Sequence, residues 1–235
     1  MSLVSNLFLL FVAASILIYY IVPRKSQWIV LLIFSYLYYI AGGPRYVVFI
    51  LFSTLVTWLM ALLIEKAEGK ENHKGARKLL ILGLILNFGM LGIVKYTNFA
   101  LENINALLHL NLRGIQLLLP LGISFYTFQS SGYLLDVYWK RCKAERHPLK
   151  YALFVSFFPQ ILQGPIGRYS RLADQLYAEH RFEGNNIIRG FERILWGFFK
   201  KMILADWAAA FADAIFEDPA KYTICVYLAG SSVIK

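Results

Sequence analysis

The chain has 235 residues, of which 58% are hydrophobic and only 16% are charged. A soluble domain of this length would have about a quarter of its residues charged, so a soluble globular enzyme is excluded. The net charge of +10 fits a membrane protein with basic cytoplasmic loops, and we expect no nucleic-acid partner. Two cysteines are too few for a disulfide framework.

Long apolar stretches predict an all-α fold, a polytopic transmembrane helical bundle. A helix needs about 20 apolar residues to cross the hydrocarbon core. The predicted spans cover residues 3–22, 28–41, 46–64, 79–94 and 115–139. Gly89 and Gly92 lie three residues apart, where a neighbouring helix could approach closely. Pro120 and Gly122 should break or bend the start of the fifth span.

The last third of the chain is less regular. Residues 151–167 are apolar but rich in Pro, Gly and Gln, which predicts a re-entrant hairpin, because irregular backbone at membrane depth must be enclosed. Residues 168–193 are polar and interfacial, residues 194–216 have a helical pattern with four charges, and residues 222–234 resemble a truncated span. We therefore expect residues 1–235 to be the N-terminal part of one transmembrane domain.

The distribution of Lys and Arg among the loops predicts the orientation. Residues 23–27 contain two, and residues 65–78 and 140–150 contain five each. The intervening segments 42–45 and 95–114 contain only one and two. Because basic loops stay in the cytoplasm, the N-terminus is predicted outside.

The histidines of the chain are poor candidates for a catalytic base. His73, His147 and His180 lie in charged loop sequence, and a general base needs a sheltered position beside its substrate. His109, in an Asn-rich segment, is little better. No zinc-ligand spacing occurs in the sequence, so no metal site is predicted.

Cys142 lies between two basic residues. These neighbours could lower its thiol pKa, or the residue could be palmitoylated beside the membrane. We favour an ordinary juxtamembrane cysteine.

Polar residues within the fifth predicted span are more informative. Gln129, Tyr133, Asp136 and Lys140 fall at i, i+4, i+7 and i+11, on one helical face. This stripe could face a bundle interior or a wet cavity. Equally, Asp136 could simply pair with Lys140 near the cytoplasmic end.

Two further groups of polar residues follow in the chain. Gln160 and Gln163 favour a cavity lining, because unpaired amides in lipid are costly. Arg189, Arg193 and Lys200 share a helical face, where they could receive an anionic donor group. Contact with lipid headgroups is the more common explanation for such a face.

Two motif segments carry a family resemblance. The first is residues 119–129, LPLGISFYTFQ, continued by Tyr133 and by Asp136 to Tyr138. The second is residues 157–169, FFPQILQGPIGRY. In this order and spacing the chain resembles the membrane-bound O-acyltransferase (MBOAT) family, and within it the bacterial branch that resembles alginate O-acetyltransferases.

The resemblance implies a helical bundle with a central channel in a bacterial plasma membrane. An acyl group, most simply acetyl, would move from a cytoplasmic thioester donor to a hydroxyl of a cell-surface polysaccharide or related acceptor. The donor would be a substrate, acetyl-CoA or an acylated carrier protein, with no bound cofactor. Expected partners are membrane lipids and an extracytoplasmic acetylation protein. The expected channel or substrate-binding residues are Gln129, Tyr133, Asp136, Gln160, Gln163 and Arg168.

The chain also departs from the family pattern. The family's catalytic histidine and its Trp-Arg-x-x-His segment would lie beyond Lys235, so no catalytic residue is assigned here. The resemblance therefore implies the N-terminal half of an acyltransferase, inactive alone. The alternative is a non-catalytic transport or assembly subunit. It is suggested by charged residues within apolar sequence, namely Asp136, Lys200 and Asp206.

Overall fold

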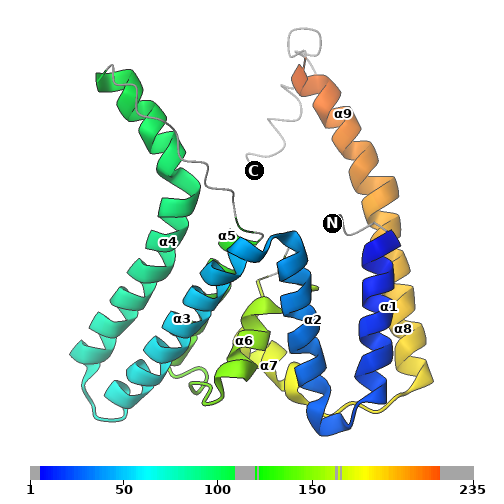
Figure 1. Ribbon diagram of the computed structural model, residues 1–235, viewed down its shortest axis with the longest axis horizontal. Coiled ribbons are helices and arrows are strands. Elements are labelled where there is room, and N and C mark those ends of the chain that lie inside the picture. Colours follow the sequence, from blue (N-terminus) through cyan, green and yellow to red (C-terminus); the bar gives the residue numbers. More distant parts are fainter. Residues whose placement is uncertain (1–5, 109–119, 121, 162–163, 165, 218–235) are drawn as a thin grey trace, which may run out of the picture. The chain divides into compact units, whose positions relative to one another are not determined.

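The computed structural model describes residues 6–108, 120, 122–161, 164 and 166–217. All elements of this described part are helices (Figure 1), as the all-α prediction expects. The chain divides into two compact units, Met1–Arg181 and Phe182–Lys235. The helices of the first unit are α1 (Asn6–Ile21), α2 (Gln27–Gly42), α3 (Val47–Glu68), α4 (His73–Leu108), α5 (Ile123–Tyr138), α6 (Pro148–Ser156) and α7 (Tyr169–Tyr177), with short 3-10 turns at Arg24–Ser26 and Pro44–Tyr46.

Aromatic contacts hold α1 against α2 and against the turn that follows α6. The ring of Phe8 lies 5.7 Å from that of Tyr38, and the ring of Phe11 lies 5.4 Å from that of Phe158. Edge-on and tilted pairs of this kind add to the free energy gained by burial. The bounds of α1 and α2 agree with the first two predicted spans to within a few residues.

Within the described residues, two helices are long and apolar enough to cross a membrane, Pro44–Glu68 and His73–Leu107, while α1 is a shorter apolar helix. α4 continues well past the predicted span at 79–94 into residues expected to be a loop. The physical reason is that a single Lys95 does not interrupt helical hydrogen bonding and no proline follows before Leu108.

A buried amide joins α3 to α4. The Oδ1 atom of Asn87 accepts a hydrogen bond from the Ser53 hydroxyl (2.6 Å), and its Nδ2 atom donates to Thr57 Oγ1 and to the carbonyl oxygen of Gly83 (both 3.0 Å). Asn87, Ser53 and Thr57 are each no more than 1% exposed. Polar groups in apolar surroundings need such partners, so this cluster sets the register of the two helices.

The close approach of helices to α4 occurs at a different glycine from those predicted. A Cβ atom at Gly83 would lie 2.9 Å from Leu134 Cδ1 of α5 and 3.3 Å from Met60 Cγ of α3. At Gly89 and Gly92 a Cβ atom would meet no described atom within 4 Å. The close approach expected at Gly89 and Gly92 is therefore not found among the described residues, because the packed face of α4 at this level carries Asn87, Leu91 and Val94, all of which are buried.

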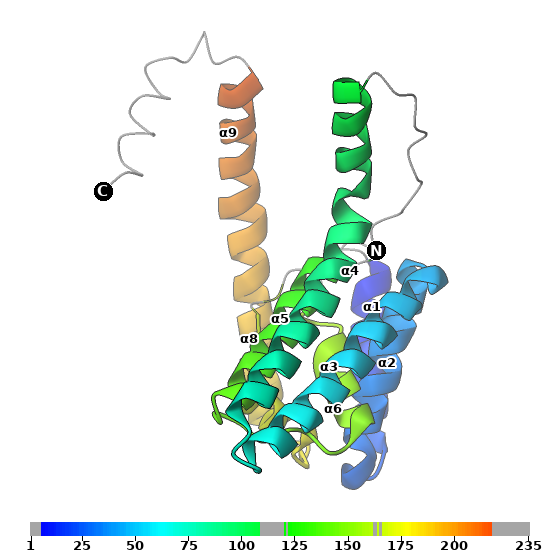
Figure 2. The same cartoon turned by 90° about the vertical axis from the view of Figure 1, so that its left-hand side faces the viewer.

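Helix α5 lies against α3, α4 and α6, and most of its residues are buried (Figure 2). It begins after Gly122, whose φ of +67° is left-handed. A Cβ atom there would lie only 2.2 Å from the carbonyl oxygen of Ile161, so only glycine fits. The predicted break at the start of this span is confirmed at Gly122; residues 115–119 lie outside the described part.

The predicted re-entrant segment is irregular, as expected from its composition. α6 ends at Ser156, and the Phe158 N–H then donates to the hydroxyl of Ser35 on α2 (3.2 Å). One turn over residues 157–161 and a non-helical stretch at 166–168 lead to α7. Phe158 and Ile161 of this stretch pack in the core of the unit, whereas Pro159, Ile166 and Arg168 are exposed.

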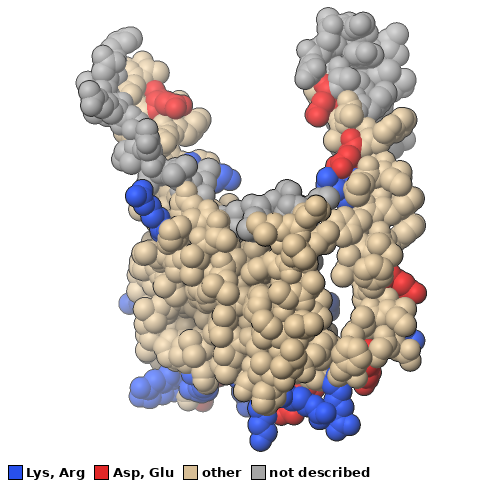
Figure 3. All heavy atoms as spheres, turned by 45° about the vertical axis from the view of Figure 1, so that its right-hand side comes forward, with Lys and Arg blue, Asp and Glu red and all other residues tan. Residues whose placement is uncertain are grey.

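Ionic contacts join two predicted cytoplasmic loops at one end of the first unit. Glu68 pairs with Lys140 (3.1 Å), and Glu65 pairs with Arg146 while accepting the N–H of Ala144. Lys and Arg side chains gather at this end (Figure 3). The loops that the charge count placed on the same side of the membrane thus meet in the structure.

The second unit is described from Phe182 to residue 217. It consists of α8 (Gly184–Phe199), a six-residue π-helix (Lys200–Ala205) and α9 (Asp206–Glu217). Helix therefore begins ten residues before the predicted start at 194, because the apolar residues of α8 recur at helical spacing through the polar stretch. The predicted span at 222–234 lies outside the described residues.

Replacing Asn87 with Ala should destabilise the first unit. The change removes three hydrogen bonds and leaves Ser53 and Thr57 without their buried partner. We expect a loss of about 1–3 kcal/mol in the free energy of unfolding, measured by thermal denaturation in detergent. The matched control is Asn103→Ala on the same helix, because Asn103 is exposed and bonds only to Phe99 O of its own helix. Equal stability of the two variants would contradict the assigned role of Asn87.

Candidate functional site

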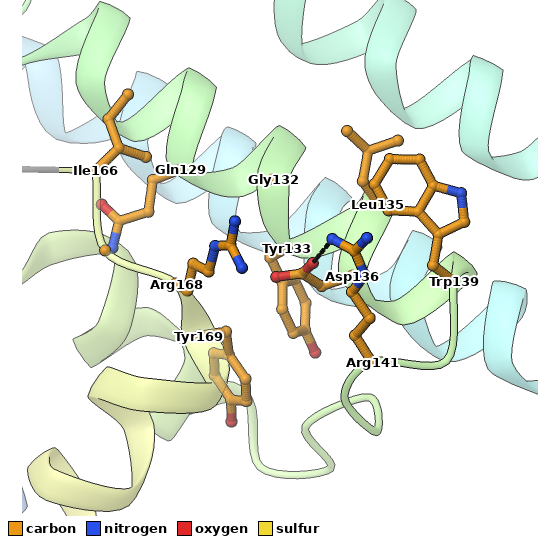
Figure 4. A pocket seen from close by; sticks show the side chains of 11 residues that line it. Gln129, Gly132, Tyr133, Leu135, Asp136, Trp139, Arg141, Ile166, Arg168 and Tyr169 are labelled. Atoms are coloured by element: carbon orange, nitrogen blue, oxygen red, sulfur yellow. Dashed lines mark ion pairs between the residues drawn. The ribbon is translucent and has the colours of Figure 1, made fainter.

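One face of α5 and the segment before α7 enclose a pocket of about 240 Å³ (Figure 4). The two walls come from the two motif segments. Four of the six predicted site residues, Gln129, Tyr133, Asp136 and Arg168, lie in this lining. The full lining is Gln129, Gly132, Tyr133, Leu135, Asp136, Trp139, Arg141, Ile166, Gly167, Arg168 and Tyr169.

Backbone groups of neighbouring segments hold the two uncharged polar side chains that α5 contributes to the pocket. The Nε2 atom of Gln129 donates to the carbonyl oxygen of Phe154 on α6 (3.0 Å). The hydroxyl of Tyr133 accepts the N–H of Glu145 (2.8 Å). Both side chains are buried, so they form fixed parts of the wall.

An aromatic cluster closes the pocket behind Tyr133. Its ring lies 4.7 Å from the ring of Tyr151 and 4.7 Å from the ring of Tyr169. The hydroxyl of Tyr169 donates to Glu145 Oε2 (2.6 Å). Burial, the neighbouring Tyr177 and the charge of Glu145 raise the pKa of Tyr169 well above its ordinary value, so this hydroxyl remains protonated.

The charged side chains of the pocket are paired differently from the alternative raised by sequence spacing. Asp136 pairs with Arg141 (Oδ1 to Nη1, 3.6 Å), whereas Lys140 pairs with Glu68 of α3. α5 ends at Tyr138 and Lys140 has a left-handed φ of +58°, which takes Lys140 out of helical register with Asp136. The predicted Asp136–Lys140 pair is therefore wrong.

Arg168 is the second cation of the pocket and stands on the opposite wall. Its guanidinium points from the 166–168 segment towards Asp136 (Figure 4). Among the described residues of this unit its side chain forms no hydrogen bond or ion pair, in contrast to that of Arg141. Two guanidinium groups and one carboxylate give the pocket a net charge of +1, so it is suited to a group with negative charge.

The two remaining predicted site residues are not part of this lining. Gln160 lies behind Gly167, where a Cβ atom would be 3.2 Å from Gln160 Oε1. This oxygen is buried and has no hydrogen-bond partner among the described atoms. Gln163 lies outside the described residues.

The described histidines contribute no general base to the pocket. His73 pairs with Glu68 (2.9 Å), His180 Nδ1 bonds to the Tyr19 hydroxyl (2.8 Å), and the ring of His147 packs on Trp28. All three are exposed; His147 and His180 lie in loops, as predicted, whereas His73 begins α4. His109 lies outside the described residues. No cluster of metal-binding side chains occurs in the described part of the chain.

Sequence reasoning missed two important contributors. From the sequence, Arg141 is treated only as a basic loop residue, although it directly follows the polar stripe of the fifth predicted span, which would indicate that it lies near Asp136. Glu145 bonds through its backbone to Trp58 Nε1 (2.9 Å) and to Tyr133, and through its carboxylate to Tyr169. Nothing in the local sequence distinguishes this glutamate from other loop charges, because its three partners come from three different helices.

Comparison with curated proteins identifies relatives of the chain. It is 34% identical over 220 residues to the probable alginate O-acetylase AlgI of Pseudomonas aeruginosa, and 34% identical over 219 residues to that of Pseudomonas syringae. It is also 34% identical over 216 residues to a peptidoglycan O-acetyltransferase of Helicobacter pylori. No protein-family model matches the chain, and no solved structure matches it significantly.

These relatives confirm the resemblance carried by the two motif segments, since they are named as O-acetyltransferases. The alignments with the two alginate O-acetylases cover 90% of this chain, and the alignment with the Helicobacter protein covers 81%. The chain spans about 40% of the length of the relatives (41%, 41% and 40%).

Cys142, beside the pocket, is half-buried, and its surroundings favour the neutral thiol. Burial, with the charges of Asp136 and Glu65, raises its pKa to about 11. The interpretation that the basic neighbours lower this pKa is therefore wrong. Because the thiolate is the reactive form, Cys142 should be unreactive at neutral pH.

Alkylation of Cys142 by a maleimide should therefore be slow and strongly pH-dependent. With Cys225 replaced by Ser, the rate should rise about tenfold per pH unit from pH 7 to 10. The matched control is Lys143→Cys in a Cys142→Ser background, because residue 143 is exposed. Its rate should level off near pH 9. A plateau below pH 9 for Cys142 would show that its thiol is not shielded.

Proposed function

We propose that this homologue of bacterial polysaccharide O-acetyltransferases is the donor-binding part of a membrane-bound O-acyltransferase. The enzyme would transfer an acetyl group to a hydroxyl of a cell-surface polysaccharide or a related acceptor. The observation that carries the proposal is the pocket of Figure 4, whose two walls are the two motif segments and whose lining has a net positive charge. The names of the relatives support the reaction class.

The donor is a thioester that approaches from the cytoplasm, acetyl-CoA or an acylated carrier protein. Both present the thioester on an arm that bears phosphate, and phosphate oxygens are bound well by guanidinium groups. Arg168 supplies such a group and Arg141 a second one, held by Asp136. A pocket of about 240 Å³ admits part of this arm.

The same proposal includes a multi-pass bundle in the bacterial plasma membrane, with residues 151–167 re-entrant and the N-terminus outside. It is supported by the two apolar helices and by exposed apolar side chains on α3 and α4, such as Val48, Leu55 and Ile93. The meeting of the basic loops at Glu65 and Glu68 supports a single cytoplasmic end.

In acetyl transfer the acceptor oxygen attacks the thioester carbonyl carbon, the C–S bond breaks, and the hydroxyl proton must leave through a base. Among the described residues no histidine lines the pocket, and its one carboxylate, that of Asp136, is paired with Arg141. We therefore propose that the chain by itself is inactive, that the base comes from further parts of the enzyme, and that an extracytoplasmic partner protein contributes to delivery to the acceptor.

Arg168→Gln in the intact enzyme should lower acetyl transfer about 10- to 100-fold. The variant removes a charge-assisted contact with the donor while keeping a polar, uncharged side chain. The measurement is incorporation of labelled acetyl groups in membranes containing the full set of acetylation proteins. The matched control is Arg171→Gln, an exposed arginine on α7 outside the pocket lining, which should retain full activity.

Equal transfer by the wild type and Arg168→Gln, at equal amounts of protein in the membrane, would contradict the donor role. The transport alternative predicts a different result, namely solute flux through proteoliposomes that contain this chain alone.

Cysteine accessibility tests the topology. In a protein without Cys142 and Cys225, Arg45→Cys should react with a membrane-impermeant maleimide in spheroplasts. Lys70→Cys should react only after lysis, because the loop that contains it is on the basic side. Both positions are exposed in the structure. The reverse pattern would invert the proposed orientation.

A further inference from the structure

Helix α8 of the second unit has an apolar face that covers nothing within its own unit. None of its sixteen residues is buried. Ile188, Phe191 and Leu195 are 58%, 60% and 52% exposed. Their spacing of three and four residues places them on one side of the helix. An apolar surface of this size on a single helix marks an interaction site.

The opposite face of α8 carries a row of cations. Arg189 and Arg193 are four residues apart, and Lys200 follows seven residues later, so the three side chains lie in one line along the helix axis. At the edge of the apolar face, Trp196 stacks on Phe199 with ring centroids 5.1 Å apart, and Lys200 lies 5.8 Å above the Trp196 ring. Aromatic rings beside cations are typical of the membrane–water interface.

A membrane-spanning role for α8 does not fit its composition. Three of its sixteen residues are charged, and the π-helix and α9, which continue it without a break, add Lys200, Lys201, Asp206 and Asp213. Charges at this density are costly inside a bilayer. The described helices that pass the length and hydropathy test for a span are both in the first unit. A helix with a basic polar face and an aromatic and aliphatic apolar face is instead the pattern of a helix that lies in the plane of the interface.

We propose that α8 lies in the headgroup region of a bilayer that contains anionic phospholipids, with its apolar face towards the acyl chains. Arg189, Arg193 and Lys200 then contact lipid phosphates from the polar face. The charges favour a lipid surface over a protein partner. A protein groove would need only the apolar face of α8, whereas anionic headgroups also interact favourably with its row of cations. This inference does not depend on the proposed acetyl transfer.

Depth measurements on the full chain in lipid nanodiscs test the proposal. Nitroxide labels are placed singly at Ile188, Leu195 and Phe199 on the apolar side, and at Arg193 as the polar-face control, with Cys142 and Cys225 changed to Ser. Collision rates with oxygen and with a water-soluble nickel chelate give the depth of each label. An in-plane helix puts the three apolar labels at one shallow depth and the Arg193 label in water.

Two other outcomes would overturn the proposal. A spanning helix would separate Ile188 from Phe199 by about 16 Å of depth, at 1.5 Å per residue. A helix covered by protein would shield all three apolar labels from lipid-soluble oxygen.

The charge requirement is tested by changing the lipid. Replacing phosphatidylglycerol with phosphatidylcholine should lower the oxygen collision rate at Ile188 several-fold, and the triple variant Arg189→Gln, Arg193→Gln, Lys200→Gln should do so in phosphatidylglycerol. An unchanged rate in both experiments would overturn the assignment of an anionic surface. The matched control is Arg181→Gln, which lies outside α8 and should leave the rate unchanged.

Discussion

The first unit is organised by the need to satisfy polar groups on an enclosed helix. α5 is surrounded by α3, α4 and α6, yet it carries an amide, a phenol and a carboxylate on one face. Unpaired, each would cost several kcal/mol in apolar surroundings. Gln129 is satisfied by a carbonyl of α6, Tyr133 by the backbone of Glu145, and Asp136 by Arg141. The positions of α6 and of the loop after α5 follow from these bonds.

The same arrangement explains why the pocket is both rigid and charged. Its α5 wall is fixed by hydrogen bonds to buried backbone, and its aromatic floor is fixed by the Tyr169–Glu145 bond. Glu145 thereby connects the two motif segments, since its backbone N–H also donates to the hydroxyl of Tyr133. The side chain of Arg168 forms no hydrogen bond or ion pair with the described residues of this unit, so its donors are available to a mobile anion.

The sequence predicted the helices and most of the pocket, because apolar runs and an i, i+4, i+7 stripe depend on local periodicity. It did not predict the partners of the charges. A spacing of four pairs Asp136 with Lys140 only if the helix continues, whereas α5 ends at Tyr138 and the left-handed Lys140 turns to Glu68. Similarly, three glycines on α4 are equivalent in sequence, and only the positions of Met60 and Leu134 select Gly83. Such information resides in contacts between distant segments.

The backbone of Gly122 lies so close to the carbonyl group of Ile161 that no Cβ atom fits between the two motif segments. A backbone-to-backbone fit of this kind leaves no room for compensation by a larger residue on one side. Chimeras between distant relatives should therefore exchange residues 119–129 and 157–169 as one block. Exchanging either block alone would place a backbone segment from one protein against a segment from another, without the close fit that the two have here.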